Sequence, residues 1–332
     1  MQNDDSFPYT DFATGWYQVA WSDEIRPGDV RPLRYFARDL VLWRTESGEL
    51  RVFDAFCPHL GAHLGYGGTV CGENIQCPFH GWLWSSEGRN VEIPYSKRPN
   101  PGQKLKVWSV REASCMIMIW YDTSGEPPQW DPPHIPEAYL DDRYVPYPTC
   151  TRVWEKRRMK PQYLAENAVD AAHQKYVHRS TEVPEVLEFG PDGDRWHSRM
   201  RFVYGQGKDA TWLTPGGQTV GHMDIEVWGM GTALGRFADT DGSVHVQTQT
   251  PVDHEFCDLR MTVLIPKEPG HPDTPSGSAL SRLQHQLKQI DHDLRVWEHM
   301  HYIARPPFPP EEAKSYSAFR EWAAHFYPQK TG

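Results

Sequence analysis

The sequence CPHLGAHLGYGGTVCGENIQCPFHGW occupies residues 57–82 and concentrates cysteine, histidine and glycine more than any other part of the chain. Cys57 and His59 form a C-x-H pair, and Cys77 and His80 form a C-x2-H pair. Two cysteines and two histidines suit a zinc ion. They equally suit a two-iron cluster in which two histidines replace two cysteines on one iron.

The spacing of the four residues favours the iron cluster, because structural zinc sites usually use C-x2-4-C pairs. C-x-H followed by C-x2-H resembles the Rieske [2Fe–2S] motif. The resemblance implies that Cys57 and Cys77 bind one iron through thiolates, and that His59 and His80 bind the other.

The same two loops indicate which kind of Rieske centre to expect. Respiratory and photosynthetic Rieske proteins carry an extra cysteine in each loop, where this chain has Ala62 and Phe79. The resemblance therefore implies a low reduction potential, which favours supplying electrons to oxygen chemistry over quinol oxidation. We interpret His63 as a polar loop residue and Cys71 as a small buried residue.

The residues around these loops predict two domains. Short apolar segments separated by turns, from about residue 16 to 122, predict a small all-β unit. The proline-rich segment 125–139 is typical of a boundary. We therefore place a Rieske domain at residues 1–140 and a catalytic domain at residues 141–332.

The second domain mixes strand and helix patterns. Alternating apolar residues predict a strand at 151–159 and an antiparallel sheet within 195–266. A helix is expected at 161–178, where proline opens the first turn, and a longer one at 277–304.

The segment ENAVDAAHQKYVH holds a second candidate site, in which Asp170, His173 and His178 form D-x2-H-x4-H. On a helix, Asp170 and His173 share a face. An unbroken helix would turn His178 roughly 140° away from them. We therefore expect the helix to widen or end just before His178, so that both imidazoles reach one metal.

Two histidines and one carboxylate suit Fe(II) with open coordination positions. The long C-terminal helix offers Asp291, Asp293 and Glu298 as carboxylates. We prefer Asp293 because it borders the apolar stripe of that helix. Asp170 suits a supporting role, in which it accepts a hydrogen bond from a ligand imidazole.

The order of these parts resembles the catalytic α-subunit of Rieske non-haem iron oxygenases over nearly the whole chain. The resemblance implies an α+β protein with an N-terminal all-β Rieske domain. Its C-terminal domain would be a helix-grip (START-like) fold, in which an antiparallel sheet surrounds a long helix. The implied ligands of a mononuclear Fe(II) are His173, His178 and Asp293.

The resemblance also implies a path between the two centres. Asp170 would bridge by hydrogen bonds from a cluster histidine, His80, to a ligand histidine, and we place Asn167 with Asp170 among the catalytic residues. In Rieske non-haem iron oxygenases this bridge joins two subunits of a homotrimer. The resemblance implies a homotrimer with the same bridge for this chain.

Finer matches indicate the substrate class. The segments ENAVDAAHQKYVHRSTEVPEV, DLRVWEHMHYIARPP and FREWAAHFYPQ look like 3-ketosteroid 9α-hydroxylase oxygenase components and sterol 7-desaturases. The expected function is a monooxygenase that hydroxylates a C–H bond of a hydrophobic, steroid-like molecule. Alternatives are an aromatic ring hydroxylase, an O-demethylase, a sterol-type desaturase, a pure Rieske electron-transfer protein or a zinc-binding interaction module.

The chain carries neither a G-x-G-x-x-G fingerprint after a strand nor a plant-type ferredoxin cysteine set. We therefore expect a separate ferredoxin or flavin reductase, which would take electrons from NAD(P)H. The net charge of −10 disfavours nucleic acid or an anionic membrane as the main partner and would suit a basic redox partner. With no signal-peptide pattern or membrane-length apolar run, we expect a cytoplasmic protein.

Overall fold

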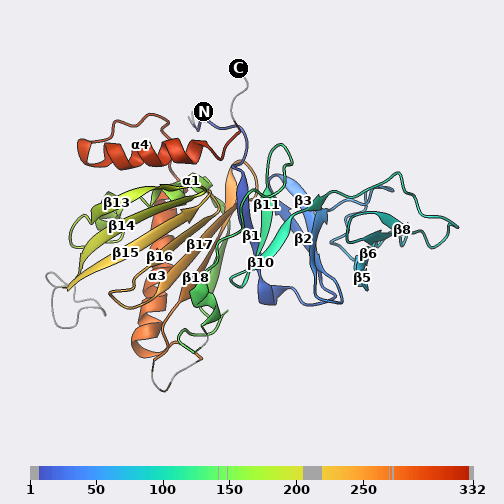
Figure 1. The fold of residues 1–332 in the computed structure, drawn as a ribbon, viewed down its shortest axis with the longest axis horizontal. Coiled ribbons are helices and arrows are strands. Elements are labelled where there is room, and N and C mark those ends of the chain that lie inside the picture. Colours follow the sequence, from blue (N-terminus) through green and yellow to red (C-terminus); the bar gives the residue numbers. More distant parts are fainter. Residues whose placement is uncertain are drawn as a thin grey trace.

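The computed structural model describes residues 7–328 apart from 141, 148, 205–218, 269 and 271–272. An N-terminal part built of short strands lies beside a larger part, in which helices cover a broad sheet (Figure 1). The α+β expectation is confirmed: three small sheets precede one seven-stranded antiparallel sheet.

The N-terminal part has three sheets, ordered β1-β11-β10, β2-β3-β4-β9 and β5-β6-β7-β8. Their strands are β1 (Gly15–Trp21), β2 (Val30–Tyr35), β3 (Arg38–Arg44), β4 (Leu50–Asp54), β5 (Thr69–Cys71), β6 (Asn74–Gln76), β7 (Leu83–Ser85), β8 (Asn90–Glu92), β9 (Val107–Trp108), β10 (Val110–Ala113) and β11 (Met116–Tyr121). Two 3-10 turns, η1 (Ser22–Glu24) and η2 (Pro136–Tyr139), complete this part.

The most apolar segments of this part fold as the sequence predicts. Every residue of β1 and of β11 is buried, and the two strands pair antiparallel. The strands β5 to β8 have three residues each and mixed burial, so they carry too few residues to show a period of two. They matter for function because β6 leads directly into the loop of Cys77.

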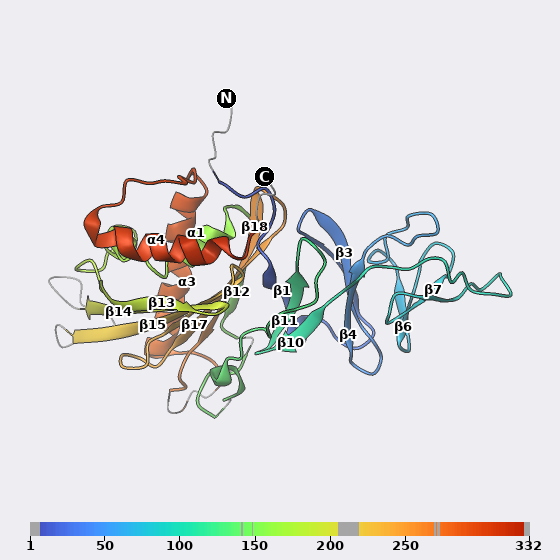
Figure 2. The same cartoon turned by 45° about the horizontal axis from the view of Figure 1, so that its top comes forward.

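The larger part is a sheet ordered β12-β18-β17-β16-β15-β14-β13. Its strands are β12 (Thr151–Arg158), β13 (Glu185–Asp192), β14 (Arg195–Tyr204), β15 (Thr219–Trp228), β16 (Thr232–Arg236), β17 (Val244–Pro251) and β18 (Phe256–Leu264). Its helices are α1 (Pro161–Glu166), α2 (Ala172–Tyr176), α3 (Gly277–Trp297) and α4 (Pro310–Ala324). Helix α3 crosses one face of the sheet, and α4 lies over β13 (Figures 1 and 2).

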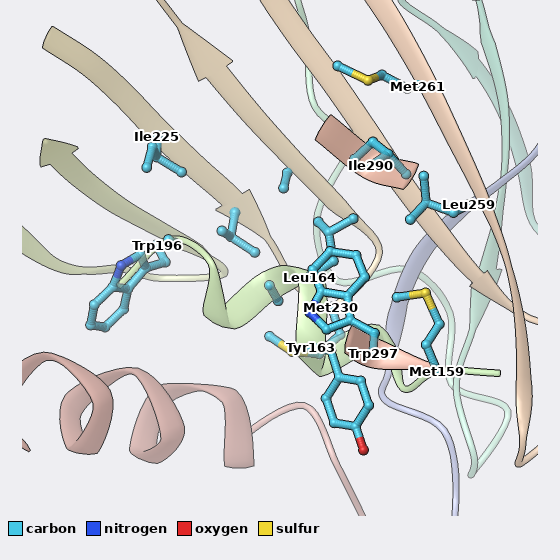
Figure 3. Close-up of a cluster of buried hydrophobic side chains, with 14 of the residues drawn as sticks. Met159, Tyr163, Leu164, Trp196, Ile225, Met230, Leu259, Met261, Ile290 and Trp297 are labelled. Carbon is cyan, nitrogen blue, oxygen red and sulfur yellow. The ribbon is translucent and has the colours of Figure 1, made fainter. Parts of the chain in front are cut away.

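Apolar side chains of the sheet and of α1, α3 and α4 meet in one core. Figure 3 shows Ile290 and Trp297 of α3 near Leu259 of β18 and Leu164 of α1, and all four side chains are buried. Burying a large apolar side chain stabilises the fold by about 1.5–3 kcal/mol. This core therefore fixes α1 and α3, the two helices that lead to the candidate metal ligands.

Helix α3 ends earlier than predicted, at Trp297 rather than residue 304. Tyr302 instead turns into the core, where its hydroxyl accepts a hydrogen bond from Gln162 at 2.8 Å. Leu280 belongs by its spacing to the predicted apolar stripe of this helix, yet its side chain is 38 % exposed. The other apolar positions of the stripe, from Leu283 onward, face the core or its edge.

A polar seam joins the two parts. The buried guanidinium of Arg260 on β18 donates to the backbone oxygens of Gln18 and Val19 on β1, at 3.3 and 3.2 Å, and to the Tyr35 hydroxyl at 2.8 Å. Hydrogen bonds to backbone atoms fix the relative position of two strands. The division of the chain at residue 140 stays a prediction.

Candidate metal centres

The two Cys/His loops repeat one backbone pattern. The N–H of Cys57 bonds to the oxygen of Ala62 and that of Cys77 to the oxygen of Trp82, both at 2.8 Å. In each loop the glycine four positions after the cysteine donates back to the cysteine oxygen, with φ near +70° to +77°. Glycine adopts this left-handed conformation without steric cost, so each loop closes tightly around its cysteine and histidine.

The four predicted cluster ligands come together at one end of the N-terminal part. The Cys57 and Cys77 side chains are buried and hydrogen-bonded to each other. This hydrogen bond from Cys57 is the main cause that lowers the pKa of Cys77 to about 6, and the same contact raises that of Cys57. The His59 and His80 rings lie 4.6 Å apart between centroids.

This arrangement fits a [2Fe–2S] cluster. The Nδ1 atom of His80 is buried without a hydrogen-bond partner among the described residues, which is costly unless a ligand fills the space. One imidazole pair and one thiol pair at a single place match the donor set of a Rieske centre.

The neighbours of these ligands are partly exposed. Trp82 stacks on the His59 ring at 4.5 Å between centroids, whereas Phe79 is 61 % exposed. His63 accepts a hydrogen bond from the backbone of Gly65, in agreement with a loop role. The expectation for Cys71 is wrong: it is exposed, because β5 lies at the edge of its small sheet.

The second candidate site begins where the helix predicted at 161–178 breaks. Proline does open α1, as predicted, but α1 ends at Glu166. Turns with hydrogen bonds between residues three apart follow, and α2 begins at Ala172. Helix α2 ends at Tyr176, and the His178 N–H then bonds to the His173 oxygen, five residues back, at 3.4 Å. This wider closure turns His178 toward the face of His173, as the spacing requires.

His173, His178 and Asp293 converge, with one ligand atom from each within 4.8 Å of the others. His178 Nε2 lies 3.0 Å from Asp293 Oδ1, and the two imidazole rings are 5.0 Å apart between centroids. Two ligands at right angles, each about 2.1 Å from a metal, would be ~3.0 Å apart. The three side chains thus fit one metal ion with open positions.

Asp170 supports this group, mainly through its backbone. Its carbonyl oxygen lies 2.6 Å from His173 Nδ1, and its carboxylate accepts the His173 backbone N–H at 3.1 Å. The carboxylate oxygen is 3.5 Å from Nδ1. Burial opposes ionisation of Asp170, yet the hydrogen bonds and charge of His173 lower its pKa, and the same pairing raises that of His173.

The other residues singled out by sequence lie around this group. Asn167 caps α1 with its backbone, and its half-buried side chain makes no hydrogen bond within the described part of the chain. Asp291 points away, since its carboxylate binds Arg152 and the Trp154 indole. Glu298 pairs with Arg157.

Sequence analysis did not predict the contacts between α4 and the segment that carries Glu166 and Asp170. Arg320 of α4 donates twice to the Glu166 carboxylate, at 2.9 and 3.0 Å, and Gln162 donates to it at 2.8 Å. The Tyr316 hydroxyl, one turn before Arg320, lies beside the Asp170 carboxylate. Glu166 and Asp170 are four residues apart in one segment, and Tyr316 and Arg320 are four apart in the other. This spacing would have indicated two facing segments only if their packing had been known.

Comparison with known families agrees with this geometry. The family model of the 3-ketosteroid 9α-hydroxylase C-terminal domain matches residues 119–327, which is more than half of the chain. The chain belongs to this family. The Rieske [2Fe–2S] domain matches residues 15–111.

Two relatives show how far the similarity extends. A 3-ketosteroid-9-alpha-monooxygenase oxygenase component of Rhodococcus rhodochrous is 28 % identical over 96 % of this chain and 84 % of its own length. The cholesterol 7-desaturase nvd of Hemicentrotus pulcherrimus is 28 % identical over 96 % of this chain and 71 % of its own.

Solved structures share the fold. Dicamba monooxygenase bound to 3,6-dichlorosalicylic acid superimposes with a TM-score of 0.74 at 20 % identity, over 95 % of this chain and 98 % of that one. The NdmA protein of Pseudomonas putida CBB5, solved with caffeine, gives 0.66 at 19 % identity, over 93 % and 89 %.

The family members are therefore Rieske non-haem iron oxygenases, and this chain is the terminal oxygenase component of such a system. Its cofactors are a Rieske [2Fe–2S] cluster and a mononuclear iron. Among the described residues, no helix is long and apolar enough to cross a membrane.

Proposed function

We propose that this oxygenase hydroxylates an unactivated C–H bond of a steroid-like substrate, using O2 and electrons from a separate reductase. The observation that carries the proposal is the convergence of His173, His178 and Asp293 beside a large apolar core, in a chain that also holds two Cys/His loops. A pure electron-transfer protein would have no use for the second group.

We assign the cluster ligands as the sequence suggests, with Cys57 and Cys77 on one iron and His59 and His80 on the other. The contact between the two buried thiols and the unpartnered His80 Nδ1 support this assignment.

We assign His173, His178 and Asp293 as the ligands of the mononuclear iron, which when bound supplies the open positions for oxygen activation. The Asp170 carbonyl oxygen fixes the His173 ring, because it accepts from Nδ1 and makes Nε2 the ligand atom. Nε2 lies 3.0 Å from the Gln174 amide nitrogen, which iron would displace. Asp293 is 5 % exposed, so the protein excludes bulk water from this side of the site.

Asp170 is also our candidate for the bridge to a cluster histidine, His80, of a neighbouring subunit in a homotrimer. Its side chain is 26 % exposed, so the carboxylate, which already contacts His173 and the Tyr316 hydroxyl, can still be reached from outside the chain. Asn167, three positions earlier, belongs to the same surface-facing turn. The supply of electrons from NAD(P)H through a ferredoxin or flavin reductase, and a cytoplasmic location, are parts of the same proposal.

The substrate proposal depends on the relatives. A steroid monooxygenase component and a cholesterol desaturase both match 96 % of this chain. Both names refer to rigid polycyclic molecules. The desaturase makes sterol desaturation the second candidate, because a desaturase and a hydroxylase both begin by removing hydrogen from a C–H bond.

Product analysis tests the proposal. The holoenzyme, an electron-donating reductase and 18O2 are incubated with a steroid panel and with an aromatic panel, and the products are identified by mass spectrometry. We expect one 18O atom in a hydroxylated steroid. A new double bond without 18O would favour desaturation, and products from the aromatic panel alone would overturn the substrate assignment.

A further inference from the structure

A buried imidazole on the seven-stranded sheet has an unsatisfied nitrogen. His245 of β17 is 6 % exposed, and its Nε2 atom is buried without a hydrogen-bond partner in the described part of the chain. A buried polar atom without a partner is costly, so in native proteins such an atom usually meets a water molecule or a ligand. The candidate iron site does not account for this atom, because His245 is not one of the three residues that converge there.

The side chain of His245 lies on the face of the sheet that α3 crosses. Its neighbours Val244 and Val246 pack with Trp120 of the N-terminal part. Successive side chains of a strand point to opposite faces, so His245 points away from the N-terminal part. Directly opposite His245 in β18, Val263 belongs to the core that α3 joins on this other face (Figure 1).

Helix α3 connects His245 with the candidate iron site. His285 of α3, whose charge acts on His245, precedes Asp293 by eight residues, or about 12 Å along the helix. Gln289 lies halfway between them, and its Oε1 atom is also buried without a partner among the described residues. A molecule with several fused rings is long enough to lie along this part of α3 and reach both the iron site and His245.

The strand next to β17 has no side chain beside the imidazole. Gly235 of β16 pairs directly with His245, and directly opposite residues share one face of a sheet. A Cβ atom at Gly235 would make only ordinary contacts, with Met223 Sδ at 3.4 Å and with the Phe237 ring at 3.9 Å. The Phe237 and His245 rings are 4.7 Å apart between centroids. Apolar and aromatic side chains therefore border the imidazole.

The charge state of His245 restricts what its Nε2 atom binds. Burial, and then the charges of His285 and Arg282, lower the pKa of His245 to about 3, so the ring is neutral under ordinary assay conditions. A substrate carboxylate would be buried here without a counter-charge, which is costly. Arg282 already pairs with Asp241 at 3.0 Å. A neutral oxygen atom suits the site better.

We propose that His245 determines substrate specificity by binding a neutral oxygen atom of the substrate, as in a ketone, at the end remote from the carbon that is attacked. The Nε2–H group donates to this oxygen, and the fused rings lie between the sheet and α3. The inference rests on the proposed function, since it names the group of a steroid-like substrate that the site recognises. His245 touches the substrate and has no role in oxygen activation.

Binding without turnover tests the proposal. The oxidised holoprotein, without a reductase, is mixed with androstane-3,17-dione that carries 13C at one carbonyl or at the other. Calorimetry gives the Kd, and infrared difference spectroscopy gives the stretching frequency of each bound carbonyl. We expect one of the two carbonyls to absorb at a lower frequency than in an apolar solvent, because a donated hydrogen bond weakens the C=O bond.

Substitutions at His245 identify the donor. His245→Leu should raise the Kd about five- to tenfold and return the shifted carbonyl to its frequency in an apolar solvent. His245→Gln retains an N–H donor, so it should keep a lowered frequency and a Kd within about threefold of the original. The matched control, His197→Leu, lies at an exposed position of β14 in the same sheet and should change neither quantity.

Gly235→Leu tests the location without altering the imidazole. Gly235 lacks the positive φ that favours glycine, so its backbone accepts a larger residue. The new side chain would occupy the space beside His245 and should raise the Kd about tenfold or more. Iron analysis and the Rieske spectrum should be unchanged. This variant keeps the test decisive if a substitution of His245 prevents folding.

The possible results separate this inference from the proposed function. If His245→Leu and Gly235→Leu leave the Kd and both carbonyl frequencies unchanged, the inference is overturned and an ordered water occupies the buried Nε2. Equal effects of His245→Leu and His197→Leu would overturn it as well. In both cases the steroid proposal stands, because the diketone still binds. Failure of the unaltered protein to bind the diketone would overturn the steroid proposal, and this inference with it.

Discussion

His178 Nε2 lies 3.0 Å from Asp293 Oδ1, although the first residue follows a five-residue helix and the second lies within the long α3. The two side chains are 9 % and 6 % exposed. Burying an imidazole against a carboxylate is costly unless the pair is charged or shares a cation. This relationship is the structural basis for the mononuclear iron centre.

Replacement of Asp293 by Ala should abolish binding of the mononuclear iron and product formation while the Rieske spectrum remains. The matched control is Asp291→Ala on the same helix, whose carboxylate binds Trp154 instead. It should cost about 1–3 kcal/mol of unfolding free energy but keep the iron. Metal analysis and denaturant unfolding distinguish the two, and iron retained at full level in Asp293→Ala would refute the ligand assignment.

Within the first cluster loop, His59 and His63 should behave oppositely. His59→Ala should remove the Rieske absorbance and electron paramagnetic resonance signal, because one iron loses an imidazole. His63→Ala removes the acceptor of the Gly65 N–H and the ring contacts with Phe56 and Tyr66, and should cost about 1 kcal/mol or slightly more. If His63→Ala also lost the signal, the assignment of the first loop would be wrong.

The buried ion pair between Glu166 and Arg320 should contribute to stability. Glu166→Gln leaves a guanidinium only 18 % exposed without its counter-charge, and we expect a loss of about 3 kcal/mol. Arg152→Gln removes an ion pair whose side chains are 43 % and 37 % exposed, and should cost less than about 1 kcal/mol. Equal losses in urea unfolding would argue against a special role for the buried pair.

His245 on β17 should make the fold sensitive to acid. Burial, and then the charges of His285 and Arg282, lower its pKa to about 3 from 6.5. The unfolded chain therefore binds a proton at a pH where the folded one does not. The contribution of neutral, buried His245 to the free energy of unfolding is full above pH 6.5 and is lost as pH falls toward 3. At pH 5 the loss is about 2 kcal/mol.

Unfolding at pH 7.5 and pH 5.0 checks this prediction. The fall in stability between the two values should be about 2 kcal/mol smaller in His245→Gln than in the unaltered protein. His299→Gln, at an exposed position, should show the full fall. An unchanged fall in His245→Gln would show that other groups cause the acid sensitivity.

The sequence could single out the candidate ligands that the structure brings together, because their chemistry restricts their identity. Cysteine and histidine at fixed spacing need no knowledge of the fold, and Asp293 follows from its place beside an apolar stripe. The break between α1 and α2 and the early end of α3 depend on contacts with distant segments, such as Tyr302 with Gln162. The Glu166–Arg320 pair joins residues 154 positions apart, so no local pattern reveals it.

The most direct test of the account is the iron content of the anaerobically reconstituted protein together with its Rieske signal. We expect about three irons per chain, two in the cluster and one at His173, His178 and Asp293. In His173→Ala/His178→Ala we expect about two, with the Rieske signal unchanged. Two irons in the unaltered protein, or three in the double variant, would contradict the presence of a separate iron at this site.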